Sequence, residues 1–244
     1  MRVLAIKLFA IFALLAFGAT AAENPPQPKA LRIAIYSGSK EYDSTASLEK
    51  LKKILEADLH ATCTIHAVEE KGTKLEGIED LDTADVAIFF TRRVSLAEEP
   101  LARVKKFVAS GKSIIGIRTA SHGFQTWLEF DQTILGGSYN NHYGKEAPAE
   151  VTLQENQKDH PILKGVKAFR TMGKLYKNPK LADDVALLLT AKTADVTEPV
   201  AWAREAVAGA HGRVFYTSLG VQKDFDEPMF QKMIVNAVNW TTGR

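Results

Sequence analysis

The sequence has only one cysteine, Cys63, in 244 residues, so no disulfide can form within the chain. Cys63 lies in the alternating stretch ATCTIHAV, which is typical of a strand, and a lone cysteine there is usually a buried apolar thiol. The chain also lacks the HxH and HExxH motifs and any Cys/His cluster. These absences exclude a disulfide scaffold and leave metal binding without a local motif.

Neither sign of charge is in excess. The sequence has 31 basic and 29 acidic residues, and Arg2 and Lys7 are the only charged residues among the first 22, so the rest has 29 of each sign. A segment without net charge or a basic cluster has no electrostatic attraction for nucleic acid, and we expect no nucleic-acid partner. The sequence also contains no internal repeat and no low-complexity segment.

The one long apolar run, LFAIFALLAF, lies at the N-terminus behind Arg2 and Lys7 and is followed by the small residues of GATAAE. This order is typical of a secretory signal, and the run is short for a membrane span. We therefore expect a signal peptide over residues 1–22, a flexible proline-containing leader over 23–30 and one domain over 31–244. The expected location is periplasmic or extracellular, without stable membrane insertion after cleavage.

The first half of the expected domain alternates between strand and helix patterns. Apolar, β-branched runs predict strands, and amphipathic stretches with leucine at helical spacing predict helices. The strands are expected at 31–38, 61–68, 86–90 and 112–117, and the helices at 44–59 and 95–111. Ser44 or Thr45 is expected to cap the first helix and Ser95 the second. The alternation predicts a doubly wound, mostly parallel α/β sheet.

The second half is less regular. Residues 125–180 are rich in Gly, Asn, Pro and Tyr and indicate a looser segment, with His160 capping a short turn that begins at Pro161. Three further strand-like runs follow at 184–191, 198–205 and 211–220, the last two joined by a hairpin-like turn, before a closing helix at 229–243.

Ligands of doubly wound sheets bind beyond the carboxyl ends of the strands. The segments at those ends supply a polar set of candidate residues: Ser37, Tyr42, Arg92, Arg93, Arg118, Thr119, His122 and Asp224. The following loop, GGSYNNHYGK, adds Asn140, His142 and Tyr143, whose amide and aromatic groups suit sugar hydroxyls and sugar rings.

The stretch GIRTASHGF carries the sharp corner at which many α/β enzymes present a nucleophile, but the corner residue is Arg118. Arg118 offers a fork for a carboxylate, a phosphate or paired hydroxyls, or else forms a salt bridge to a loop acid. His122 is the candidate acid/base, with His142 as its partner or a metal ligand. The alternative is that both are hydrogen-bonded loop histidines.

Several separated motifs resemble the ThuA-like (trehalose utilisation) domain: LRIAIYSG, GKSIIGIRTASHGF, HPILKGVKAF…KLYKNP, EPVAWAREAVAGAHGRVFYTSLG and VNAVNW. The resemblance spans about residues 31–242 and implies a class I glutamine amidotransferase-like fold, which is flavodoxin-like, and a link to sugar metabolism. True amidotransferases of that fold carry a cysteine at the position of Arg118. The sequence departs from the family pattern in two further ways: Gly173 and Lys174 replace an acidic pair, and Val221 replaces a histidine.

Together these observations predict an exported protein that acts on or binds a small carbohydrate without the amidotransferase nucleophile. The expected catalytic residues are His122 and His142, and the expected substrate-binding residues are Ser37, Tyr42, Arg92, Arg118, Thr119, Asn140 and Tyr143. The alternatives are a non-catalytic sugar-binding or scaffold protein and a hydrolase that uses a divalent metal. Enzymatic activity, the metal and the oligomeric state stay open.

Overall fold

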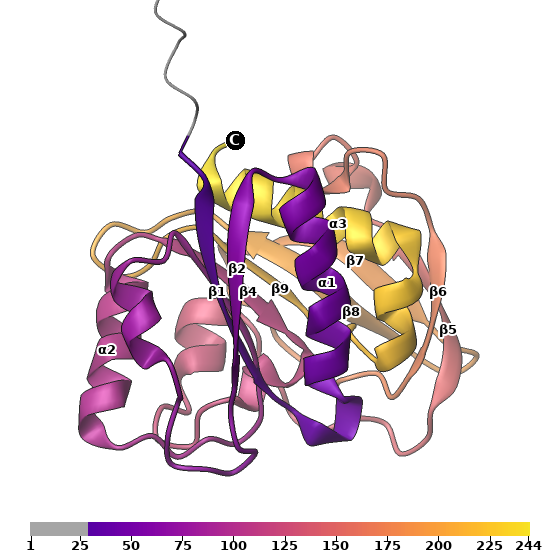
Figure 1. Ribbon diagram of the computed structural model, residues 1–244. Helices are drawn as coiled ribbons and strands as arrows, with labels where there is room; N and C mark the ends of the chain where they lie inside the picture. The colour runs from indigo at the N-terminus through magenta and orange to yellow at the C-terminus, as the bar shows by residue number, and fades with distance from the viewer. Residues whose placement is uncertain (1–28) are drawn as a thin grey trace, which may run out of the picture.

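The computed structural model describes residues 29–244 of the chain. The expected signal peptide and residues 23–28 of the expected leader lie outside the described residues. No helix in the described part has the length and apolar character needed to cross a membrane. The guanidinium of Arg244 donates a hydrogen bond to the Lys29 carbonyl (2.8 Å), so the C-terminus lies beside the start of the described chain (Figure 1).

Nine strands form one sheet in the order β2-β1-β3-β4-β9-β8-β7-β5-β6 (Figure 1). Their bounds are β1 Leu31–Gly38, β2 Ala61–Ala67, β3 Val86–Thr91, β4 Ser113–Ile117, β5 Ala147–Leu153, β6 Phe169–Gly173, β7 Ala186–Lys192, β8 Thr197–Arg204 and β9 Val214–Thr217. The pairs from β2 to β9 are parallel, and the pairs from β9 to β6 are antiparallel.

The α/β class is therefore confirmed, but the expected mostly parallel sheet is not, because the sheet is mixed. β8 and β9 are joined by the predicted hairpin-like turn, which the Val207–His211 bridge closes, and a hairpin makes its two strands antiparallel. β5 and β6 lie in the segment interpreted as loose. Their short runs, APAEVTL and FRTMG, alternate buried with exposed positions at one edge of the sheet, and they include Pro and Gly.

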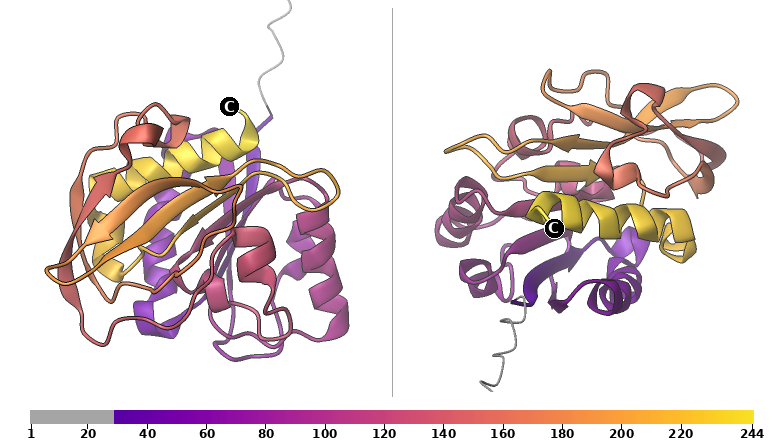
Figure 2. Two further views of the ribbon diagram at one scale, coloured as in Figure 1. Left: turned by 180° about the vertical axis from the view of Figure 1, so that it is seen from behind. Right: turned by 90° about the horizontal axis from the view of Figure 1, so that it is seen from above.

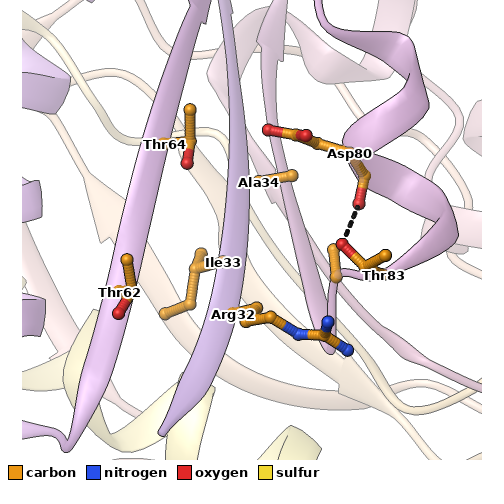
Figure 3. A pocket seen from close by; sticks show the side chains of 8 residues that line it. Arg32, Ile33, Ala34, Thr62, Thr64, Asp80 and Thr83 are labelled. Atoms are coloured by element: carbon orange, nitrogen blue, oxygen red, sulfur yellow. Dashed lines mark hydrogen bonds between the residues drawn. The ribbon is translucent and has the colours of Figure 1, made fainter.

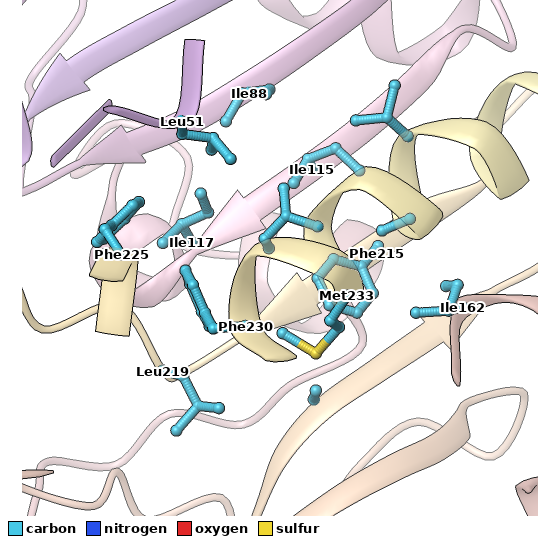
Figure 4. Packing of buried hydrophobic residues seen from close by; sticks show 14 of the residues in the cluster. Leu51, Ile88, Ile115, Ile117, Ile162, Phe215, Leu219, Phe225, Phe230 and Met233 are labelled. Atoms are coloured by element: carbon cyan, nitrogen blue, oxygen red, sulfur yellow. The ribbon is translucent and has the colours of Figure 1, made fainter. Parts of the chain in front are cut away.

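Helices cover both faces of the parallel half. α1 (Ser44–Asp58) and α3 (Pro228–Thr242) lie side by side on one face (Figure 1), and α2 (Glu98–Ala109) covers the other (Figure 2). Between α3 and the sheet, Met233 and Phe230 pack with Ile115 and Phe215 (Figure 4). This burial on both faces explains why the parallel strands are apolar at nearly every position.

The remaining helical segments are short. They are η1 Lys40–Tyr42, η2 Ile78–Asp82, η3 Arg118–His122, the π-helix η4 Phe130–Leu135, η5 Glu155–Gln157, η6 Pro161–Leu163 and η7 Gln222–Asp226. The predicted cap of η6 is confirmed, because the His160 ring accepts a hydrogen bond from the Ile162 N–H and Pro161 is the first helical residue. Cys63 is buried as expected, and burial raises the pKa of its thiol to about 12.

The first predicted helix starts at residue 44 as expected, but the predicted caps of both helices are wrong. α1 is preceded by Asp43 in a left-handed conformation, so Ser44 is its first residue and not its cap. The Ser44 hydroxyl instead accepts from the Ser39 N–H (2.9 Å) and lies 2.8 Å from the Ser37 hydroxyl, within the loop that follows β1. α2 begins at Glu98 after Ala97, three residues beyond the predicted Ser95 cap.

Candidate functional site

The carboxyl ends of the parallel strands meet at one edge, as the topology predicts. Gly38 at the end of β1 pairs with Thr91 at the end of β3, and Ile117 of β4 pairs with Thr217 of β9. η3 begins directly after β4, so the stretch from Arg118 to His122 lies in the crevice beyond the sheet.

Arg118 occupies the sharp corner between β4 and η3. Its φ of 47° lies in the left-handed region, which is unfavourable for a residue with a side chain. The Tyr216 hydroxyl donates a 2.7 Å hydrogen bond to the Arg118 carbonyl and holds the corner. The backbone therefore has the strained geometry of a nucleophile elbow, with an arginine at the corner.

The Arg118 side chain is turned into the protein, and only 3% of the residue is exposed. Its guanidinium donates to the carbonyls of Ser218 (2.7 Å) and Lys174 (3.3 Å). It also donates to the Tyr42 hydroxyl (3.3 Å) and lies between the Tyr42 and Tyr176 rings, 4.2 and 4.7 Å from their centroids. Arg118 thus joins four chain segments, and no carboxylate of residues 29–244 forms a salt bridge with it.

The positions that depart from the family pattern lie beside Arg118. Gly173 precedes Lys174, and a Cβ at Gly173 would lie 2.8 Å from the Val221 side chain and 3.6 Å from the Arg118 guanidinium. The absent side chain at Gly173 therefore leaves the room that Val221 and Arg118 fill. The two departures form one packed contact, with an apolar side chain where the family pattern has a histidine.

His122 lies at the end of η3, in the crevice. Its ring stacks on the Tyr139 ring (centroids 4.3 Å apart, planes 20° apart), and its Nδ1 is 3.1 Å from the Ser121 hydroxyl. Burial, followed by the charges of Arg92, Arg93 and Arg118, lowers the pKa of His122 to about 3. The imidazole is therefore neutral at physiological pH, with one nitrogen that donates and one that accepts.

A hollow of about 410 Å³ opens beside this stack. We call it the His122 hollow, and its lining residues are Ser121, His122, Phe124, Leu128, Asp131, Gln132, Ser138, Tyr139, Asn140 and Pro179. Its volume lies in the range of small-ligand sites, roughly 300 to 1,000 Å³. Polar groups and aromatic rings share its wall, which is the combination that a polyhydroxylated ring requires.

Asp131 is a wall residue of this hollow that the sequence analysis missed. It belongs to η4, is 5% exposed, and accepts a 2.7 Å hydrogen bond from the Tyr139 N–H at Oδ2. Burial raises the pKa of this carboxyl to about 7. The only signal in the sequence is a single acid in FDQTIL, where polar and apolar residues are mixed. Without the fold, this acid looks like an ordinary residue on the surface of a helix.

The other expected site residues divide into two groups. Asn140 lines the His122 hollow, and the backbone of His142 bridges to Tyr176, whose ring centroid is 5.8 Å from that of His122. His142 itself donates from Nδ1 to the Tyr143 carbonyl (2.9 Å). The two histidines form no hydrogen bond with each other in the described chain.

The second group contacts other parts of the protein. The Tyr143 hydroxyl donates to Glu198 (2.7 Å), and Arg92 forms ion pairs with Glu70 and Glu41. Thr119 is fully buried, and its hydroxyl has no hydrogen-bond partner among residues 29–244.

Ser37 and Asp224 also lie outside the His122 hollow. Ser37 lines a separate hollow of about 470 Å³ at the end of β1, which has no aromatic lining residue. Asp224 is buried, accepts from the Thr171 hydroxyl (2.7 Å) and caps η7 through the N–H groups of Gly220 and Val221.

Two more hollows lie away from the crevice. One of about 160 Å³, between Arg32, Thr62, Thr64 and Asp80 (Figure 3), is smaller than a typical ligand site. The other, about 790 Å³, lies by the C-terminal end of α3 and the start of β9, at the opposite end of the strands. In residues 29–244 no three His, Cys, Asp or Glu side chains are grouped in a way that could hold a metal ion.

Comparisons with known proteins agree with this architecture. The sequence profile of the ThuA family, described as trehalose utilisation, matches residues 32–241. A ThuA-like protein from Parabacteroides merdae is similar in structure, with 17% identity, a TM-score of 0.69, and coverage of 88% of this chain and 90% of that chain. A ThuA-like protein from Bacteroides uniformis has the same identity and TM-score, with 91% and 95% covered.

A glutamine amidotransferase from Thermotoga maritima is 12% identical, with a TM-score of 0.52 and coverage of 88% of this chain and 100% of that chain. At these identities the solved structures show a shared fold alone. No curated protein matches the chain. The expected ThuA resemblance and the expected likeness to the amidotransferase fold are both confirmed.

Proposed function

The chain belongs to the ThuA family, described as trehalose utilisation, and on that premise we propose that it binds a small carbohydrate in the His122 hollow. The observation that carries the proposal is the composition of that hollow at the end of β4. The Tyr139 ring offers an apolar surface for a sugar ring, and Ser121, His122 and Asn140 offer hydrogen-bonding groups for its hydroxyls.

His122 has a binding role in this proposal, in place of the acid/base role expected from the sequence. An acid/base catalyst works best with a pKa near the operating pH, and His122 has a pKa of about 3. A neutral imidazole can still donate to one hydroxyl oxygen and accept from another hydroxyl. The low pKa therefore favours sugar binding through His122 over proton transfer by His122.

Arg118 has a positioning role in this proposal. Its terminal nitrogens, Nη1 and Nη2, donate to Ser218, Lys174 and Tyr42, so the fork is already occupied by groups of the protein. Its buried charge contributes to the low pKa of His122, after the larger effects of burial, Arg92 and Arg93. Arg118 thus forms the corner and helps to keep the hydrogen-bonding ring of His122 neutral.

We also propose that the protein is exported, on the order of charged, apolar and small residues at the N-terminus. Expression of the full chain with fractionation and N-terminal sequencing tests this. We expect mature protein outside the cytoplasm that begins near residue 23, and a cytoplasmic protein that keeps its first 22 residues would refute it.

Calorimetric titration with trehalose, maltose and glucose tests the binding proposal, with NMR of the same mixtures to reveal any product. We expect saturable binding, weakened about tenfold in His122→Ala, which corresponds to roughly 1.4 kcal/mol. His60→Ala is the matched control, because His60 is exposed and precedes β2 at the opposite end of the strands. Equal affinity of His122→Ala and wild type would show that His122 is not part of the binding site.

A further inference from the structure

Asp131 has one carboxylate oxygen that the protein satisfies and one that it does not. Oδ2 accepts from the Tyr139 N–H, while Oδ1 has no hydrogen-bond partner among residues 29–244. A buried polar atom without a partner is costly and is uncommon in folded proteins. This oxygen lies in a residue that forms part of the wall of the His122 hollow.

The local backbone maintains this arrangement. Asp131 is in the π-helix η4, and π-helical turns are rare and often occur at functional sites. Gly137 passes directly beside the carboxyl, and a Cβ at Gly137 would lie 2.6 Å from Oδ1. The glycine therefore preserves the space around Oδ1. Rotation about the Cβ–Cγ bond of aspartate is soft, so the carboxyl can turn at a small energetic cost.

The polar groups around Asp131 form their hydrogen bonds with atoms other than Oδ1. From β9, the Tyr216 hydroxyl donates to the Arg118 carbonyl. From β8, Arg204 is paired with Asp184 and donates to the carbonyls of Thr133 and Ile134 in η4. From η3, the Ser121 hydroxyl lies 3.1 Å from Nδ1 of His122.

None of these groups contacts Oδ1, so its hydrogen-bonding capacity remains for a molecule from outside the chain. The carboxyl is next to the surface on which a sugar is proposed to lie, and a sugar hydroxyl is a donor of suitable size.

We propose that Asp131 anchors the ligand of the His122 hollow, with Oδ1 accepting a hydrogen bond from a sugar hydroxyl. This inference rests on the proposed function and adds to it the residue that selects a hydroxylated ligand. A hydrogen bond to a charged acceptor is stronger than one between neutral groups. The ionised carboxylate is therefore the tighter-binding form.

The anchor makes binding dependent on pH. The pKa of the free carboxyl is about 7, because burial disfavours its charge, and the ligand hydroxyl favours the charged form and lowers that pKa. Binding then releases up to one proton near neutral pH. The ionised fraction rises roughly tenfold between pH 6 and pH 8, and affinity should rise by about the same factor.

Calorimetric titration of trehalose into the full mature protein tests the anchor, at pH 6, 7 and 8 and in two buffers with different ionisation heats. We expect the wild type to bind about tenfold more tightly at pH 8 than at pH 6, with proton release. Asp131→Asn keeps the shape of the side chain and should bind with affinity that does not vary with pH. Glu129→Gln, an exposed carboxyl two residues earlier, should behave as wild type.

The outcomes separate the two proposals. If the wild type binds none of the saccharides, the proposed function and the anchor both fail. If the wild type binds but Asp131→Asn keeps the same affinity and the same pH dependence, the anchor alone fails. Circular dichroism of Asp131→Asn checks its fold. Carboxyl ¹³C NMR of the ligand-free wild type gives a second readout, since a titration near pH 4 would overturn the predicted pH dependence of binding.

Discussion

The corner at Arg118 and the hollow at Asp131 are two parts of one crevice, and each contains a buried charged group. The Arg118 guanidinium donates to Ser218, Lys174 and Tyr42 and lies between two aromatic rings. The Asp131 carboxyl accepts one hydrogen bond and keeps one oxygen without a partner in the described chain. Arg118, which occupies the position of a nucleophile, thus has a structural role.

The difference shows that a position at a strand end does not by itself make a residue a ligand-binding residue. Both groups keep one buried atom without a hydrogen-bond partner in the described chain, Nε of Arg118 and Oδ1 of Asp131. What separates them is their surroundings, because Asp131 lines the His122 hollow and Arg118 does not. Buried polar atoms are almost always satisfied, so an unsatisfied one beside a hollow is the stronger indication of a ligand. Three sets of variants test this comparison.

The largest expected effect is a pair of opposite pH dependences of the free energy of unfolding. The pKa of Asp131 is raised to about 7, so its contribution to the stability of the folded state is present at low pH and is lost as pH rises from about 4 to 7. The pKa of His122 is lowered from 6.5 to about 3, so its contribution to that stability is present above pH 6.5 and is lost as pH falls toward 3. Each effect is at most on the order of 4 kcal/mol, and in the wild type they oppose each other.

Each single variant should therefore show the pH dependence of stability that comes from the group it keeps. We expect stability to rise with pH between about 4 and 6.5 in Asp131→Asn, and to fall over that range in His122→Gln, relative to wild type. Urea unfolding at several pH values measures this, and His60→Gln should keep the wild-type profile. Parallel profiles for Asp131→Asn and His122→Gln would refute the environments assigned to both groups.

A somewhat smaller effect is expected at the corner. Arg118→Ala should destabilise the protein by about 3 kcal/mol, because two buried carbonyls lose their donor and a cavity forms between Tyr42 and Tyr176. Arg118→Gly should lose about 1 kcal/mol less, since glycine adopts a φ of 47° without the penalty of a side chain.

Urea unfolding of both variants at one pH measures the corner effect. A loss below about 1 kcal/mol in Arg118→Ala would contradict the structural role, because surface substitutions usually cost less than that.

The smallest effect is expected at Tyr143, which the sequence analysis named as substrate-binding. Its hydroxyl donates to Glu198 and lies outside the wall of the His122 hollow. Tyr143→Phe should therefore lower the thermal midpoint slightly and leave saccharide affinity unchanged, as measured by calorimetry. A clear loss of affinity would show that the site also includes Tyr143, in the GGSYNNHYGK loop.

Seven of the nine strands could be predicted from the sequence, but β5 and β6 of the antiparallel half could not. β1, β3 and β4 are buried on both faces, so their runs are continuously apolar and stand out. β5 and β6 lie at the other edge, with polar residues at alternate positions and a proline and a glycine among them. Local patterns of that kind also occur in loops.

The candidate site shows the same division. His122 and Asn140 could be placed near the crevice because strand ends and glycine-rich loops are recognisable in sequence. Asp131 and Tyr176 could not. Asp131 lies in a π-helix, and Tyr176 is followed by the residues KNP. Neither segment has a pattern that indicates a strand end.

The sequence by itself determined the α/β class, the family resemblance and the absence of a nucleophile at residue 118, because these depend on local periodicity and on which residue occupies the corner. Only the tertiary structure decided the roles of the charged groups. Hydrogen-bond satisfaction and burial arise from segments far apart in the chain, such as Ser218 at Arg118 and Tyr139 at Asp131. Packing placed one charge within the protein's own contacts and left one oxygen of the other available to a ligand.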